Sequence, residues 1–162
     1  MRAELLFPKQ VRVFVLLAAA AGLLAAGCAK VPLVGGKPSV SVRLTATANC
    51  NNCGKTSGYP LTFRVLQVTD PTLLTGTTLT QVWDREDKLL GDGLVSRNED
   101  VIDPGTRKEL KLERNAKAKA VVVVGNFCKT QGSCWYYVKP LKGGGATIRL
   151  SVEASCFGEA RR

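Results

Sequence analysis

The sequence contains no histidine, a single methionine and few aromatic residues (6%). Without histidine, the chain cannot build a Ser-His-Asp triad, a Cys-His pair or a histidine-ligated metal site. The glycine run 143–145 lacks the Lys-Ser/Thr pair and the helix that would make it a phosphate-binding loop. Acidic residues stand among basic ones, as in segment 84–88, which favours a solvated surface over paired catalytic carboxylates. These absences predict a non-catalytic protein without a cofactor and without a metal site.

Negative charge is also scarce, with 13 Asp+Glu against 23 Lys+Arg and a formal net charge of +10. The basic residues are scattered singly, without the run or the aromatic interleaving that is typical of a nucleic-acid surface. We therefore expect no nucleic-acid partner, and an acidic protein surface or lipid headgroups are better candidates.

The first 27 residues are typical of a bacterial secretory signal. Arg2, Lys9 and Arg12 give a positive start, and an uncharged run rich in Leu, Val and Ala fills residues 13–27. This run is shorter than the roughly 20 residues of a membrane-spanning helix but suits a signal-peptide core. It ends in Leu-Ala-Ala-Gly before Cys28, which resembles the bacterial lipobox. The N-terminal position of the segment, its positive start and its lipobox-like end together favour lipidation of Cys28. The other two interpretations are an ordinary secretory signal and a buried helix.

The lipobox resemblance implies cleavage before Cys28 and N-terminal acylation, with three acyl chains holding the mature protein on a membrane. Ala29 follows the cysteine where an Asp would favour inner-membrane retention, so the resemblance implies the periplasmic face of the outer membrane. We expect a lipoprotein signal peptide at residues 1–27, a lipidated tether rich in Pro and Gly at 28–38, and one domain at 39–162. Cleavage leaves 20 Lys+Arg and 12 Asp+Glu in the mature chain.

The mature part alternates between apolar and polar residues with the period of two that indicates strands. Strands are expected at 39–48, 61–69, 94–103, 106–114, 118–127, 135–141 and 146–154. Asp70-Pro71 predicts the start of a helical segment that extends to about Glu86, with its best part at 79–87. Seven short strands with regular turn signals predict an all-β fold, a two-sheet antiparallel β-sandwich with one short helical insertion.

Five cysteines besides Cys28 are disulfide candidates in an oxidising envelope: Cys50, Cys53, Cys128, Cys134 and Cys156. A hairpin between two strands would bring Cys128 and Cys134 within bonding distance, so this pair is the first choice. Cys156 ends the last expected strand, and it is a candidate partner for Cys50 or Cys53.

Two other uses of the cysteines remain open. Cys50 and Cys53 form a Cys-x-x-Cys motif, but a redox site needs a helix after the first thiol, and the glycine-containing stretch 54–58 is a poor helix. A zinc site made by Cys50, Cys53, Cys128 and Cys134 has a permitted spacing, although secreted thiols usually oxidise first.

The order of motifs resembles a known family. Residues 42–46 (Val-Arg-Leu-Thr-Ala) open the domain, and residues 60–68 (Pro-Leu-Thr-Phe-Arg-Val-Leu-Gln-Val) follow. Then come Val82-Trp-Asp, Leu90-Gly-Asp, Asp103-Pro-Gly, the apolar strand 121–127 and Trp135. This order is similar to the type VI secretion outer-membrane lipoproteins, the TssJ (SciN/VasD) family.

The resemblance implies a transthyretin-like sandwich that serves as an outer-membrane anchor. It implies binding to the periplasmic C-terminal domain of TssM, within a complex that also contains TssL. The partner-binding loop of the family matches the loop after the first strand, whose non-cysteine residues are Asn49, Asn51, Asn52, Gly54, Lys55, Thr56, Ser57 and Gly58. The alternative is an unrelated envelope lipoprotein whose sandwich is a ligand-binding or inhibitor module, which predicts a concave apolar pocket.

Overall fold

The computed structural model describes residues 37–160. The predicted signal peptide, the lipidation site Cys28 and most of the predicted tether lie outside these residues. Within the described part, no helix combines the length and the apolar character that crossing a membrane requires.

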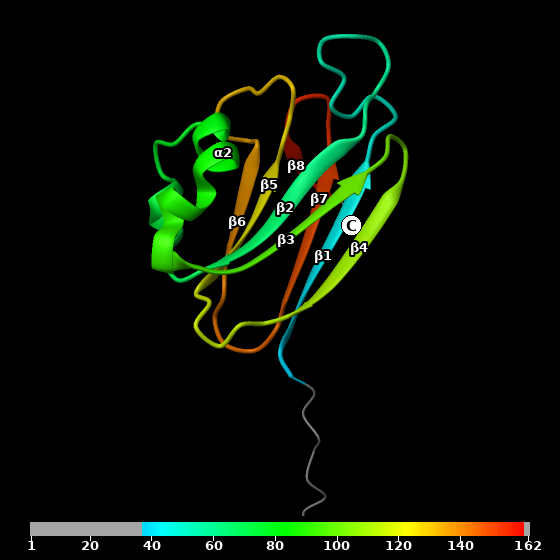
Figure 1. The fold of residues 1–162 in the computed structure, drawn as a ribbon. Helices are drawn as coiled ribbons and strands as arrows, with labels where there is room; N and C mark the ends of the chain where they lie inside the picture. Colours follow the sequence, from blue (N-terminus) through cyan, green and yellow to red (C-terminus); the bar gives the residue numbers. More distant parts are fainter. Residues whose placement is uncertain (1–36, 161–162) are drawn as a thin grey trace, which may run out of the picture. The chain divides into compact units, whose positions relative to one another are not determined.

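The described residues form two four-stranded sheets (Figure 1). One sheet has the order β4-β1-β7-β8 and the other has the order β3-β2-β5-β6. The strands are β1 (Ser39–Ala46), β2 (Leu61–Val68), β3 (Leu94–Ile102), β4 (Arg107–Glu113), β5 (Ala120–Gly125), β6 (Tyr136–Pro140), β7 (Ala146–Val152) and β8 (Phe157–Glu159). The predicted two-sheet sandwich is confirmed, and the described part adds β8, which is too short at three residues to give a period-two pattern.

The alternation of apolar side chains explains why each strand has a buried face. In β1, Val40, Val42, Leu44 and Ala46 are buried, whereas Arg43 and Thr45 are exposed. All six residues of β5 are buried, as expected for the continuous apolar run of a central strand. Strand pairing is antiparallel except between β1 and β7, where Val42 lies opposite Ile148 in parallel register. Turn signals indicate only which consecutive strands form hairpins, so they do not predict the parallel pairing of β1 with the distant β7.

The helical insertion has two main pieces and covers the outer face of the second sheet. The predicted segment divides into the 3₁₀ turn η1 (Pro71–Leu74) and the helix α2 (Leu79–Leu90), and the turn η2 (Gly91–Gly93) follows. Thr78 and Gln81 form a reciprocal capping box that starts α2 at its best-predicted part. Arg64 on the outer face of β2 bonds the carbonyl of Trp83, and the fully buried Leu66 shares that face.

Candidate functional site

Three of the connections at one end of the sandwich are linked to one another (Figure 1). They are the β1–β2 loop (49–58), the β5–β6 loop (126–135) and the β7–β8 turn (153–156), and together we call them the loop end. The described chain enters β1 at the opposite end, so β1 runs from the entry point to the β1–β2 loop. The loop predicted to bind a partner is therefore one of three neighbouring segments.

The base of the β1–β2 loop is fixed by hydrogen bonds from Asn51. Its backbone N–H donates to the Glu153 carbonyl (3.0 Å), and its side-chain Nδ2 donates to the Pro60 carbonyl (3.0 Å). Its Oδ1 accepts the backbone N–H of Cys128 (3.0 Å). Asn51 is only 7% exposed and has a positive φ of 47°, a conformation that Asn tolerates better than most residues. One asparagine thus joins the three connections.

A disulfide joins Cys53 of the β1–β2 loop to Cys128 of the β5–β6 loop across 75 residues of sequence. The preferred Cys128–Cys134 pairing is therefore wrong. After β5 the chain does not turn directly into β6, because Asn126 donates its N–H to Thr62 of β2 (2.9 Å) and continues the β2 side of the sheet. Cys128 is carried towards the β1–β2 loop, away from β6.

The remaining cysteines of the described part, Cys50, Cys134 and Cys156, are free thiols, so Cys156 is not bonded to Cys50 or Cys53. Cys50 is fully buried, and its Sγ donates to the Tyr59 carbonyl (3.5 Å). Burial raises the pKa of the Cys50 thiol, and the carboxylates of Asp103 and Glu153 raise it further. A redox couple of Cys50 with Cys53 does not fit, because Cys53 is bonded elsewhere and Cys50 is a buried, poorly ionised thiol.

The zinc hypothesis fails for a related reason. Two of its four ligands, Cys53 and Cys128, use their sulfur atoms to form the disulfide. Among residues 37–160, no group of three or more His, Cys, Asp or Glu side chains is placed to hold a metal ion.

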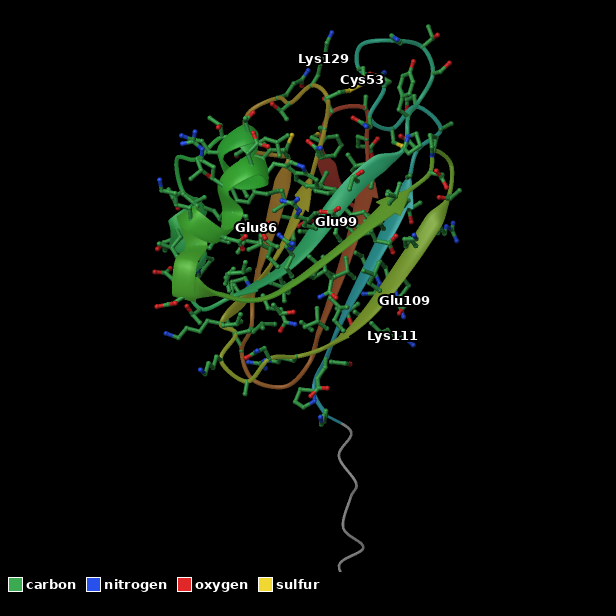
Figure 2. The ribbon with its side chains drawn as sticks, viewed as in Figure 1. Cys53, Glu86, Glu99, Glu109, Lys111 and Lys129 are labelled. Atoms are coloured by element: carbon green, nitrogen blue, oxygen red, sulfur yellow. A yellow bond between two sulfur atoms is a disulfide. The ribbon has the colours of Figure 1, made fainter. Side chains whose placement is uncertain are left out.

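The tip of the β1–β2 loop, residues 54–57, is exposed above this fixed base. Lys55 places its Nζ 3.2 Å from the Tyr59 hydroxyl oxygen and 5.3 Å from the centre of the Tyr59 ring. The side chain of Lys129 lies against Gly54, where an added Cβ would be 2.5 Å from its Nζ. Figure 2 shows Lys129 and Cys53 together at the loop end.

The loop tip therefore presents two ammonium groups beside a partly exposed tyrosine. Neither loop contains an acidic residue between positions 49–58 or 126–135. Lys55 was part of the sequence-based site, whereas Lys129 and Tyr59 were not. Lys129 lies at the site because its neighbour Cys128 is bonded to Cys53, a pairing that the sequence did not predict. The chemistry of this tip suits a protein surface that is acidic or rich in carbonyl groups.

Two clefts of the described part are lined mostly by charged side chains, unlike the apolar pocket expected of a ligand-binding module. The cleft beside α2 has a volume of about 390 Å³ and is lined largely by charged side chains. Another cleft, on the outer face of the first sheet, includes Arg43, Arg107 and Arg149.

Comparison with known proteins gives a consistent result. The family model described as type VI secretion lipoprotein, VasD, EvfM, TssJ matches residues 38–155. No curated protein matches the chain. The fold is similar to the type VI lipoprotein TssJ1 from Pseudomonas aeruginosa, with a TM-score of 0.69, 19% identity, and coverage of 78% of this chain and 98% of that chain.

Two further structures share the fold. The Serratia marcescens protein Lip, a membrane-bound component of the type VI secretion system, matches with a TM-score of 0.71, 15% identity, and coverage of 78% of this chain and 99% of that chain. A chain from a structure described as the TssM C-terminal domain from EAEC matches with a TM-score of 0.65, 11% identity, and coverage of 77% and 99%. At these identities the likeness shows a common fold.

Proposed function

The chain belongs to the type VI secretion lipoprotein family, and we propose that it anchors the envelope complex of the secretion machine to the outer membrane by binding the periplasmic domain of TssM. This is a family of structural secretion components, so the chain is not an enzyme. The finer role has two parts, a membrane anchor and a partner-binding surface.

The proposed anchor is Cys28, acylated after removal of residues 1–27 and followed by the tether 28–38 and the sandwich 39–162. The lipobox, the positive N-terminus and Ala29 support this anchor on the periplasmic face of the outer membrane. The eight residues of β1 carry the chain about 26 Å from its entry point to the loop end. The proposed anchor precedes β1 in the chain, and the proposed partner-binding loop follows it.

The observation that supports partner binding best is the exposed tip 54–57 on a base fixed by Asn51 and the Cys53–Cys128 disulfide. A loop that is ordered before binding loses less conformational entropy when the partner docks, which leaves more of the contact energy for affinity. The description of one structural neighbour as the TssM C-terminal domain also supports the choice of partner. We expect TssL in the same complex.

Binding is tested at the loop tip with charge reversals that leave the base intact. The variants Lys55→Glu and Lys129→Glu, and the double variant, are made in the full chain, which is purified in detergent. Affinity for the periplasmic domain of TssM from the same genome is then measured by biolayer interferometry. We expect each single variant to weaken binding about tenfold, since one desolvated charge pair contributes on the order of 1.4 kcal/mol or more.

The matched control is Lys142→Glu, which makes the same charge change at an exposed site in the β6–β7 connection, at the opposite end of the sandwich. It should bind TssM as the wild type does. If all variants bind TssM as the wild type does, the interface lies away from the loop tip. If Lys142→Glu loses as much affinity as the loop-tip variants, the lysines act through long-range attraction and not through a local contact.

The anchor is tested separately by Cys28→Ser, with Cys50→Ala as a cysteine control. We expect the first variant to leave the outer-membrane fraction and the second to remain there. Retention of Cys28→Ser in the membrane at wild-type levels would contradict lipid anchoring.

A further inference from the structure

Two free cysteines meet where the two sheets approach each other at the loop end. Cys134 is the second-last residue of the β5–β6 loop, and Cys156 directly precedes β8. The backbone N–H of Phe157 donates to the carbonyl of Cys134 (2.8 Å). This hydrogen bond joins the first residue of β8 in one sheet to the β5–β6 loop next to the other sheet, and it makes the backbones of Cys134 and Cys156 close neighbours.

The side chains of the two residues are also close. Burial raises the pKa of the Cys156 thiol to about 11, and the neighbouring Cys134 thiol raises it further. The Cys134 Sγ itself donates to the Gln131 carbonyl (3.0 Å). A disulfide requires Cα atoms roughly 4.4–6.8 Å apart, and the hydrogen bond from Phe157 to Cys134 holds the backbones of Cys134 and Cys156 together at this point. Both residues are partly buried and neither is part of the Cys53–Cys128 bond.

We propose that Cys134 and Cys156 are oxidised to a second disulfide in the mature protein. The two thiols give up two protons and two electrons and form one S–S bond. The oxidant is a disulfide-carrying thiol oxidant of the envelope, whose own S–S bond is reduced to two thiols by stepwise exchange through a mixed disulfide. The disulfide does not depend on the proposed function.

The second bond would complete a set of links around the loop end. Cys53–Cys128 joins the β1–β2 loop to the β5–β6 loop. The new bond joins the β5–β6 loop to the β7–β8 turn. The turn is already joined to the β1–β2 loop, because Asn51 and Asn52 donate their N–H groups to Glu153 and Ala154 (3.0 and 3.1 Å).

The segment 129–133, which carries Lys129, is then held covalently at both ends. Cys128 ties one end to the β1–β2 loop and Cys134 ties the other end to the opposite sheet. The consequence for function, which rests on the proposed role of the loop end, is that oxidation reduces the number of conformations of the Lys129 loop before a partner binds.

The sequence allows a direct test, because the four cysteines lie on four tryptic peptides. Cys53 lies on 44–55, Cys128 on 120–129, Cys134 on 130–142 and Cys156 on 150–161. The full chain is purified in detergent from an oxidising bacterial envelope, alkylated with iodoacetamide in denaturant without reductant, digested and analysed by mass spectrometry. We expect peptide 130–142 linked to 150–161, peptide 44–55 linked to 120–129, and alkylation at Cys50 alone among these five cysteines.

Alkylated Cys134 and Cys156 peptides, or a link of either residue to another cysteine, would overturn the proposal.

The thermal stability of cysteine variants gives a second measurement. Cys134→Ser and the double variant Cys134→Ser/Cys156→Ser should lower the Tm by the same several degrees under non-reducing conditions. In Cys134→Ser, iodoacetamide should now label Cys156. A Tm equal to that of the wild type, or a further decrease in the double variant, would contradict a bond between these two residues.

Discussion

Arg64 and Glu86 form an ion pair that is almost fully removed from water. Arg64 Nη1 lies 3.3 Å from Glu86 Oε2, and the two side chains are 13% and 3% exposed. The same guanidinium stacks 3.9 Å from the centre of the Trp83 ring and pairs with Glu99 (2.7 Å). Glu86 belongs to α2 and Glu99 to β3, and both are labelled in Figure 2. One arginine of β2 therefore holds the helix and the edge strand together.

Replacing Arg64 by Ala should lower the free energy of unfolding by about 3 kcal/mol, because Glu86 would stay buried without its nearest counter-charge. Arg64→Lys should recover only part of this loss, since an ammonium group cannot reproduce the forked contacts and the stacking. Urea denaturation at neutral pH measures both. Arg149→Ala, on the exposed outer face of β7, is the control and should change stability by less than about 0.5 kcal/mol. Equal effects of Arg64→Ala and Arg149→Ala would show that the ion pair contributes nothing.

The pH dependence of stability should reveal the burial of Glu86. Burial raises the pKa of Glu86 above its usual 4.5, although Arg64 and Arg97 act to lower it. The folded chain then holds a proton at a pH where the unfolded chain has lost it. Stability relative to Glu86→Gln should therefore be highest below about pH 4.5 and should fall as the pH rises through the raised pKa.

Urea unfolding of the wild type and Glu86→Gln at several values between about pH 4 and pH 7 tests this sign. The variant lacks the titrating group but keeps the other carboxylates, so the difference between the two curves isolates Glu86. A difference that grows in favour of the wild type as the pH rises would mean that the two arginines lower this pKa more than burial raises it.

Gln67 joins the two sheets from inside the core. It is 1% exposed, its Nε2 donates to the Glu113 carbonyl (2.9 Å), and its Oε1 accepts the Asn115 N–H (2.8 Å). Gln67→Leu keeps a side chain of similar size but leaves these backbone groups without their partner. We expect a loss of about 1–3 kcal/mol in unfolding free energy. The exposed Gln131, changed to Leu, should have almost no effect in the same chemical denaturation.

The sequence predicts those features of the fold that depend on residues close together in the chain. Alternation in β1 and the apolar run of β5 depend on local side chains facing a core, so the strands and the sandwich follow from the pattern. The buried position of Glu86 does not follow, because segment 84–88 has the composition of a solvated surface. Its burial arises from contact with Arg64, 22 residues away in sequence.

The candidate site was predicted only in part for the same reason. The β1–β2 loop could be located from polar residues between two strands. The partner of Cys53 could not be found, since the disulfide depends on how the chain leaves β5, and Asn126 follows β2 there. The addition of Lys129 to the loop tip is a consequence of that long-range bond.

The Cys53–Cys128 disulfide should contribute strongly to stability because it closes a long loop. For a sequence separation of 75 residues, the chain-entropy model gives about 4.5 kcal/mol, an upper value if the reduced chain keeps some structure. Cys53→Ser/Cys128→Ser should therefore lower the Tm well below that of the wild type. The control Cys50→Ala keeps this bond, so dithiothreitol should lower its Tm as it lowers that of the wild type. A Tm of the double variant equal to that of the wild type would mean that the hydrogen bonds of Asn51 are sufficient to hold the loop.

Gly58 should be the residue of the β1–β2 loop most sensitive to a small substitution. An added Cβ would lie 2.5 Å from the Ala48 carbonyl oxygen and 2.9 Å from that of Cys50, and both are backbone atoms that cannot rotate away. Gly58→Ala must therefore shift the loop base, and we expect a loss of about 1–3 kcal/mol in stability with weaker TssM binding. The neighbouring Ser57→Ala, at an exposed position, should leave stability unchanged. Unchanged stability and binding in Gly58→Ala would mean that the loop base accommodates the added methyl group without cost.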